Sequence, residues 1–132
     1  MRTKLLTIGI LALSSGIAMA GRVQPAPVVV TVNADGSGQA NGSMATARAS
    51  ANDVEYIGCG VRKGDNGAGG ANTNGFCQAG DAAGVTAYCY TTNAELLDGF
   101  ENVADYSFIT FSWSADGTCR TIGVSTQSFY IP

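Results

Sequence analysis

Hydrophobic and polar residues alternate in most of the apolar segments of this chain, and a period of two is typical of β-strands with one buried face. The β-branched run Val28–Val32 predicts one strand, and Val54–Val61 predicts another. Alanine occupies every second position from Ala45 to Ala51, so the same pattern predicts an extended segment there. Repeated short strands of this kind predict a β-rich fold.

The segment Phe76–Cys89 predicts a β-hairpin at the centre of the fold. Asp81 is a residue type that begins type I turns, and Gly84 can adopt the left-handed conformation that closes a three-residue loop. Counting outward from this loop places Cys77 opposite Cys89. In this register the two cysteines occupy a hydrogen-bonded position of the ladder, where the Cα atoms lie farther apart than at a non-hydrogen-bonded position. This geometry is less suited to a disulfide, so bonds from Cys77 and Cys89 to the other two cysteines stay open as alternatives.

A second hairpin is predicted from the most apolar part of the sequence, Ser107–Ser114 and Cys119–Ser125. Between them, Asp116-Gly117 is a strong signal for a two-residue turn. This turn predicts three cross-strand pairs on one face: Trp113 with Arg120, Phe111 with Ile122, and Ile109 with Val124. Cys119 falls on the other face, from which it can tether the hairpin to a neighbouring strand.

One helix is predicted, and we expect it to cover the apolar face of that hairpin. Thr92 and Glu95 have the spacing of a capping box, in which each side chain satisfies a free backbone N–H of the other residue. Apolar residues then recur at helical spacing: Leu96, Leu97, Phe100, Val103 and Ala104. By contrast, glycine and asparagine dominate Lys63–Gly75, which predicts a flexible, exposed loop.

The first 20 residues have the features of a signal peptide. Arg2 and Lys4 precede an apolar run, and Ala18-Met19-Ala20 is a small-residue cleavage site. No second long hydrophobic run follows, so we expect no membrane anchor after cleavage. Residues 21–53 are expected to form an extended or strand segment that folds as one unit with a cystine-containing domain over residues 54–132.

The four cysteines, Cys59, Cys77, Cys89 and Cys119, are an even set in a chain predicted to be exported. Such a set favours two disulfides, with three connectivities open, and predicts a secreted or periplasmic protein. The spacings lack the closely spaced cysteine pairs of zinc sites, and the chain contains no histidine. We therefore expect no metal and no other cofactor.

Charge and residue types also limit the functions. The sequence has 7 basic and 10 acidic residues, and cleavage removes two of the basic ones. The remaining cations are scattered, so we do not expect nucleic acid as a partner. Without histidine a Ser-His-Asp arrangement is impossible, and Lys63 is the only lysine left to activate a serine. No catalytic residues are predicted, and we expect a protein that is not an enzyme.

Aromatic and basic side chains are the candidates for a recognition surface. If exposed, Trp113 and Arg120 form a cation–π pair beside a turn, and Lys63 lies in the predicted loop. Four tyrosines could add a stacking surface for a sugar or a peptide: Tyr56, Tyr88, Tyr90 and Tyr130. The alternative is that Trp113 belongs to the core, and we favour it because Trp113 lies in the most apolar predicted ladder.

Several short motifs are spread over residues 54–132. They are Tyr56-Ile57-Gly58-Cys59, Phe76-Cys77-x-Ala79 with Asp81-x-x-Gly84, Cys89, Ser107-Phe108-Ile109-Thr110-Phe111, Asp116-Gly117-Thr118-Cys119 and Ser128-Phe129-Tyr130-x-Pro132. In these motifs the chain resembles a group of small, exported, uncharacterised bacterial proteins with four cysteines. The resemblance implies a secreted, cystine-containing domain, and it carries no activity and no functional residue.

Together these patterns predict an α+β, β-rich single domain, in which an antiparallel sheet with one packed helix is held by two disulfides. The expected function is that of a secreted, non-enzymatic protein that acts through its surface on an unknown partner. Two alternatives stay open. The Val28–Val32 strand could add to the sheet of a second copy and so build a self-assembling subunit, or the Lys63–Gly75 loop could form the contact surface of an inhibitor or binding module.

Overall fold

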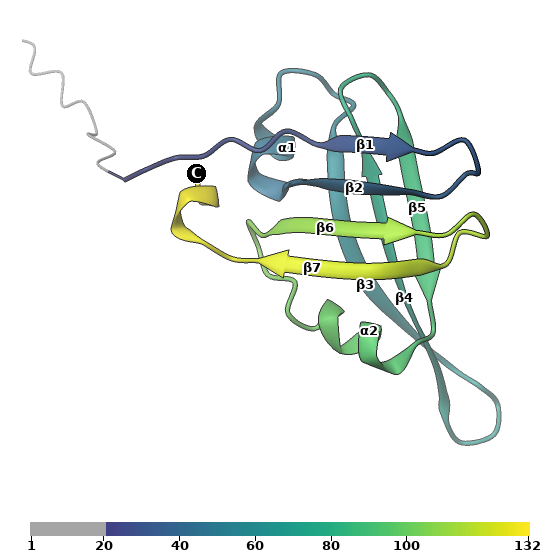
Figure 1. Cartoon of the computed structure of the whole chain (residues 1–132). Coiled ribbons are helices and arrows are strands. Elements are labelled where there is room, and N and C mark those ends of the chain that lie inside the picture. The colour runs from purple at the N-terminus through teal and green to yellow at the C-terminus, as the bar shows by residue number, and fades with distance from the viewer. Residues whose placement is uncertain (1–20) are drawn as a thin grey trace, which may run out of the picture.

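Seven strands within residues 21–132 form two antiparallel sheets that face each other across the core (Figure 1). The computed structural model describes residues 21–132, so the predicted signal peptide lies outside the described residues. Sheet A has the strand order β1-β2-β6-β7, and sheet B has the order β3-β4-β5. The strands of sheet A are Val29–Val32 (β1), Gly38–Ser43 (β2), Phe108–Trp113 (β6) and Cys119–Ser125 (β7). Those of sheet B are Tyr56–Asp65 (β3), Ala71–Gly80 (β4) and Thr86–Thr91 (β5).

The prediction of a β-rich α+β fold with two disulfides is confirmed, although the strands form two sheets rather than one. Two short α-helices, Met44–Ala49 (α1) and Ala94–Phe100 (α2), and a 3₁₀-helix, Ser128–Tyr130 (η1), complete the elements of the described residues. In Figure 1 the strands of sheet A run across those of sheet B, which is the orthogonal way of packing two sheets.

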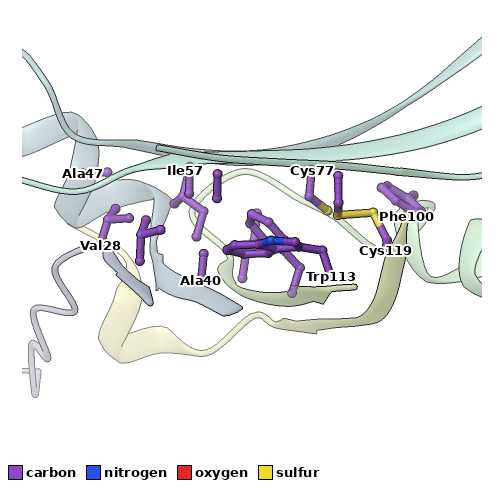
Figure 2. Close-up of a cluster of buried hydrophobic side chains, with 14 residues drawn as sticks. Val28, Ala40, Ala47, Ile57, Cys77, Phe100, Trp113 and Cys119 are labelled. Atoms are coloured by element: carbon purple, nitrogen blue, oxygen red, sulfur yellow. A yellow bond between two sulfur atoms is a disulfide. The ribbon is translucent and has the colours of Figure 1, made fainter. Parts of the chain in front are cut away.

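Apolar residues from both sheets fill the space between them (Figure 2). Sheet A contributes the predicted apolar ladder, in which Ile109 and Phe111 are almost completely buried. Trp113 is only 7% exposed, and its indole Nε1 donates a hydrogen bond to the carbonyl oxygen of Gly36 at 2.9 Å. Sheet B contributes smaller residues from its inner face: Ile57, Cys77, Ala79, Ala87 and Cys89. The interpretation that Trp113 belongs to the core is confirmed.

The N-terminal part contains the predicted strand β1 but differs in the segment that follows. The alternating alanines lie in helix α1 and not in a strand, because alanine has the highest helix propensity and the Ser43 hydroxyl caps the helix by accepting a hydrogen bond from the Thr46 N–H. A strand that the pattern missed, β2, lies between β1 and β6. Its small residues make room for larger neighbours, since Gly38 lies directly against the ring of Trp113.

The prediction of a flexible loop over Lys63–Gly75 is wrong, because most of this segment is β-structure. The ladder between β3 and β4 continues out to the pair of Asp65 and Ala71. The turn closes with a hydrogen bond of 3.1 Å from the Asn66 N–H to the Gly70 carbonyl. Glycine and asparagine are poor strand formers, which is why the composition indicated a loop. The β3–β4 hairpin extends beyond the rest of sheet B as an exposed arm (Figure 1).

Three hairpin connections share one loop of three residues that ends in a left-handed glycine. The five-residue motifs are Asn33–Ser37, Asp81–Val85 and Ser114–Thr118. In each, the N–H of the first residue donates to the carbonyl of the fifth, and the glycine N–H donates to the carbonyl of the first. The glycines have φ between +80° and +86°, which favours glycine over other residues. The loop predicted after Asp81 is confirmed, whereas the two-residue turn predicted at Asp116-Gly117 is wrong.

A β-bulge in β7 compensates for this longer loop. Trp113 pairs with Cys119, and Arg120 is the extra residue of the bulge. Beyond the bulge the predicted register is restored, so that Ile109 pairs with Val124 as expected. The predicted pair of Trp113 with Arg120 is therefore wrong. Cys119 faces the core together with Trp113, and not the outer face on which the sequence placed it.

The carboxylate of Asp116 caps the loop between β6 and β7. Its Oδ1 accepts hydrogen bonds from the Ser114 hydroxyl at 2.6 Å and from the Thr118 N–H at 3.0 Å. These bonds, that of Ser114 first, lower the pKa of Asp116 from 3.8 to about 2. Because the folded state has the lower pKa, this contribution to stability is complete above the ordinary value of 3.8 and is lost as the pH falls through about 2.

Helix α2 begins one residue later than a Thr92 cap would place it. The N-cap is Asn93, whose Oδ1 accepts hydrogen bonds from the N–H groups of Glu95 at 2.9 Å and Leu96 at 3.3 Å. The capping box predicted from Thr92 and Glu95 is therefore wrong. The helix also ends earlier than the apolar stripe suggested, at Phe100, whose side chain is buried.

The helix α2 packs at one end of the sandwich, not over the apolar ladder of β6. Leu97 and Phe100 lie against Gly75 of β4, and Gly99 lies near Ile122 of β7. The helix therefore contacts both sheets, and the ladder that we expected beneath it faces sheet B instead. An apolar stripe on a helix and an apolar face on a strand each predict that the surface is buried. They do not predict which element packs against which.

The four cysteines form two disulfides, as predicted, and the structure gives the pairing that the sequence left open. Cys59 of β3 bonds to Cys77, its direct partner in β4, and Cys89 of β5 bonds to Cys119 of β7. Cys77 and Cys89 face each other in register, as predicted, but each is bonded elsewhere. The second bond therefore joins the two sheets covalently (Figure 2). Two disulfides indicate a protein of an oxidising compartment.

The two disulfides should differ in how readily they are reduced. Cys59 is partly exposed, whereas Cys89 and Cys119 are 0% and 2% exposed. A thiolate must reach a sulfur to attack it, so the buried Cys89–Cys119 bond can be reduced only after local opening of the fold. An opening free energy of about 1.4 kcal/mol already slows the reaction about tenfold. We therefore expect dilute reductant to open the Cys59–Cys77 bond at least about tenfold faster than the Cys89–Cys119 bond. Timed alkylation and peptide mapping would measure both rates, and equal rates would contradict the buried position of the second bond.

The N-terminal segment and the C-terminal tail lie side by side. The Gln24 N–H donates a hydrogen bond to the Phe129 carbonyl at 2.9 Å. The Tyr130 ring stacks on Phe108 of β6 with ring centroids 5.2 Å apart. Both ends of the described chain therefore meet at one corner of the sandwich (Figure 1).

Candidate functional site

The outer face of sheet B carries a group of exposed aromatic side chains. Along β3, β4 and β5 the odd-numbered residues, such as Ile57 and Cys77, point into the core, and alternation directs the even-numbered residues to the outside. Four of these even-numbered residues are aromatic: Tyr56, Phe76, Tyr88 and Tyr90. The three tyrosines are 42%, 56% and 50% exposed in that order, so the rings remain available for contact. We call this outer surface of sheet B the aromatic face.

Arg62, Phe76 and Tyr88 form a continuous row across the three strands of the aromatic face. The guanidinium carbon of Arg62 lies 4.5 Å from the centroid of the Phe76 ring, which is a cation–π contact. The rings of Phe76 and Tyr88 are stacked, with centroids 6.3 Å apart and planes 24° apart. The register produces this row, because Phe76 pairs with Gly60 and Tyr90, and its diagonal neighbours are then Arg62 and Tyr88.

Two glycines let the rings lean across neighbouring strands. The Tyr56 ring lies so close to Gly80 that a Cβ there would be 2.5 Å from the ring, and a Cβ at Gly60 would be 3.2 Å from the Phe76 ring. Larger residues at these two positions would push the rings away. The contacts with the backbone hold the rings in place, and a surface that is ordered before binding loses less entropy when a ligand arrives.

The aromatic face carries no carboxylate. The sequence has 10 acidic residues, and none of them is at an even-numbered position of β3, β4 or β5. Arg62 is the only charged side chain at these positions, and within residues 21–132 its guanidinium forms no salt bridge. Its strand partner is Asn74, and Gln78 follows two residues after Phe76. In a chain of net charge −3, the outward-facing positions of these three strands therefore carry no acidic residue.

The structure does not bring together the three residues predicted as a recognition surface. Trp113 is buried, so it cannot form the proposed exposed pair with Arg120. Arg120 is exposed on the bulge of β7, in sheet A. Lys63 is exposed on the arm, where it pairs with Thr73. A common surface of these three side chains is thus not formed.

The stacking surface predicted from tyrosines is closer to what the structure shows. Tyr56, Tyr88 and Tyr90 lie on the aromatic face, whereas Tyr130 lies in η1 and stacks on Phe108. Sequence reasoning missed Phe76 and Arg62. The predicted hairpin register contained the signal for Phe76, because positions 76, 88 and 90 have the same parity and must share one face. Arg62 lies between the predicted strand Val54–Val61 and the predicted loop Lys63–Gly75, so the sequence patterns did not assign it to a face of the sheet.

A groove of about 430 Å³ lies between the N-terminal segment, α1 and the C-terminal tail. Much of its lining is apolar and includes Pro27 and Phe129. Its one acidic side chain, Glu55, accepts hydrogen bonds from the Val28 N–H at 3.0 Å and from the Asn52 Nδ2 at 2.6 Å. The Glu55 carboxylate therefore holds the surrounding chain in place.

Within the part of the chain that the structure describes, no three Asp, Glu, His or Cys side chains lie close enough to bind a metal ion together. None of the helices in residues 21–132 is both long and apolar enough to cross a bilayer. Comparisons with protein-family models, curated proteins and solved structures gave no match to this chain. Its function is therefore inferred from the aromatic face itself.

Proposed function

We propose that this protein is an exported, non-enzymatic binding module that recognises its ligand with the aromatic face of sheet B. The observation that carries the proposal is the row of Arg62, Phe76 and Tyr88, with Tyr56 and Tyr90 beside it. Tyrosine and arginine are among the residue types that contribute most binding energy at recognition surfaces. Rings that pack against backbone and stack on each other form a surface that is ready for binding.

The chemistry of the rest of the chain supports a role in binding outside the cytosol. The sequence contains no histidine, and all four cysteines are paired, so no thiol nucleophile is present. Disulfides persist in oxidising compartments, in agreement with the signal peptide predicted for residues 1–20. These features favour secretion or a periplasmic location.

The exposed arm belongs to the same surface. Arg62, Gly64, Asn72 and Asn74 are its even-numbered residues, and they continue the aromatic face toward the tip. The idea that Lys63–Gly75 presents a binding site is therefore retained within this proposal, with a β-hairpin in place of a loop. Lys63 itself lies at an odd-numbered position, on the opposite side of the arm.

Replacing Tyr88 by alanine is expected to weaken ligand binding by about tenfold or more, because truncating an aromatic anchor at the centre of a recognition surface costs about 1–2 kcal/mol. Wild-type protein and Tyr88→Ala would be compared on an array of soluble polysaccharides and synthetic peptides. Tyr106→Ala is the matched control, since Tyr106 is 46% exposed but lies outside sheet B. Melting temperatures would show that all three proteins are folded.

Retention of at least one class of probe by the wild type and by Tyr106→Ala, with loss in Tyr88→Ala, would support the proposal. Equal retention by all three proteins would place the binding site elsewhere. Failure of the wild type to retain any polysaccharide or peptide would contradict a binding role for the aromatic face.

Self-assembly through β1 is a second candidate, because β1 is an edge strand of sheet A and Val29 and Val32 are each 50% exposed. An edge strand leaves backbone groups free to pair with a second copy. We rank this candidate below the first because β1 has only 4 residues, and short edge strands are one of the devices by which proteins avoid such pairing.

A further inference from the structure

Resting on the proposed function, we propose that the ligand of the aromatic face is an acidic polysaccharide. Its sugar rings would stack on Phe76 and Tyr88 while one of its carboxylates pairs with Arg62. The row of Arg62, Phe76 and Tyr88 presents a cation and two aromatic rings in sequence. A uronic acid polymer presents a carboxylate and an apolar ring face in every repeating unit.

The charge distribution selects an anionic ligand. Arg62 is the only charged side chain on the face, and no carboxylate there competes for it. The contact with Phe76 at 4.5 Å restrains the guanidinium, so less side-chain entropy is lost when its N–H groups bind. The planar fork of these donors matches a carboxylate in two parallel hydrogen bonds, which is the strongest common pairing of this kind.

The neutral side chains suit a sugar. One face of a pyranose ring consists mainly of C–H groups and packs on aromatic carbon, whereas its hydroxyl groups require donors and acceptors around the ring. Asn74 and Gln78 supply amides that both donate and accept, on either side of Phe76 in β4. The hydroxyls of Tyr88 and Tyr90 add further polar groups at the edge of the face.

Two other classes of polymer fit less well. A peptide that pairs with a sheet binds at a strand edge, where backbone groups are free, whereas the row lies on the outer face and is centred on β4, whose backbone groups are used in ladders on both sides. Nucleic acid requires several phosphate-binding cations, and this face has one. A polyuronate needs only the groups that the face contains.

The test compares polygalacturonate and alginate with the carboxyl-reduced forms of the same polymers. These pairs keep the sugar chain and remove only the charge. By affinity electrophoresis and titration calorimetry, we expect the mature protein to bind at least one native polyuronate about tenfold or more tightly than its reduced form. Arg62→Gln should lose that advantage and bind native and reduced polymer alike. Arg120→Gln is the control, because Arg120 is an exposed arginine in sheet A.

Each outcome separates this inference from the proposed function. Binding of neither polyuronate, or an unchanged affinity of Arg62→Gln, overturns the inference. Equal binding of native and carboxyl-reduced polymer also overturns it, since a neutral polysaccharide would then be the ligand. In all of these cases the proposed function is tested separately, by whether Tyr88→Ala loses binding to the probes that the wild type retains on the array. Selective retention of peptides by the face would support the proposed function and overturn the polysaccharide.

Discussion

Removal of the disulfide between the sheets by Cys89→Ala with Cys119→Ala is expected to lower the free energy of unfolding by about 3–4 kcal/mol. The bond closes a separation of 30 residues, for which the chain-entropy relation gives this magnitude. Both cysteines are also buried in the core, so that the lost sulfur atoms leave space between the sheets. Urea denaturation of the oxidised wild type and of the double variant would measure the difference.

The matched control removes the other disulfide, with Cys59→Ala and Cys77→Ala. The Cys59–Cys77 bond closes a separation of 18 residues between strands that already pair through a long ladder. We expect its removal to lower the free energy of unfolding by about 3 kcal/mol or less. The order of the two effects is the decisive result. A larger loss from the control would show that the bond between the sheets is not the main covalent support of the core.

Replacing Gly38 by alanine is expected to cost about 1–3 kcal/mol, although the change adds a single methyl group. A Cβ at this position would lie 2.5 Å from Cζ2 of Trp113 and would also meet the carbonyl oxygen of Thr31. The ring cannot move freely, because its Nε1 is hydrogen-bonded to Gly36 and its other contacts are in the core. Thermal or urea unfolding monitored by Trp113 fluorescence would report both the stability and the environment of the ring.

Gly64→Ala is the matched control for this substitution. Gly64 also lies in a strand, β3, but no atom comes within 4 Å of a Cβ built there. Alanine should be neutral or slightly stabilising at this position, because glycine loses more conformational freedom on folding. If both variants lost similar stability, the close approach of Gly38 to Trp113 would not be the cause.

The sequence patterns predicted the central hairpin and the C-terminal hairpin because their signals are local. The loop after Asp81 depends on one aspartate and one left-handed glycine, and both lie within five residues. The C-terminal hairpin had the correct register for a partly wrong reason. Its loop is one residue longer than predicted, and the bulge at Arg120 cancels that difference.

The errors occurred where tertiary contacts outweigh local preference. β2 contains glycine, glutamine and asparagine, and it is a strand because it pairs with β1 on one side and β6 on the other. Gly38 and Gly42 leave room for Trp113 and Val28. The alanine segment alternates with a period of two, but alanine has no side chain long enough to make such a pattern meaningful. The arm was missed because its glycine-rich composition is typical of loops, although it forms a continuous ladder.

The candidate site could be predicted only in part. Tyr56, Tyr88 and Tyr90 were recognised as a stacking surface, because exposed tyrosines on strands are visible in a sequence pattern. The contact of Arg62 with Phe76 depends on the register between β3 and β4. That register runs continuously from the turn of Asn66–Gly70 to the disulfide between Cys59 and Cys77, which are 18 residues apart, in a segment whose composition predicts a loop. Only the structure shows that these side chains share a face.

The two disulfides enclose separate stretches of chain, and residues 21–58 lie outside both. This arrangement has a mechanical consequence when the chain is pulled by its ends. Under tension, β1 and β2 can peel from sheet A, whereas the 18- and 30-residue separations cannot extend. At roughly 3.4 Å per residue, the two disulfides shorten the maximum end-to-end length of the stretched chain by about 160 Å. The cysteines thus act as stops that limit extension to the uncrosslinked segments until a reductant is present.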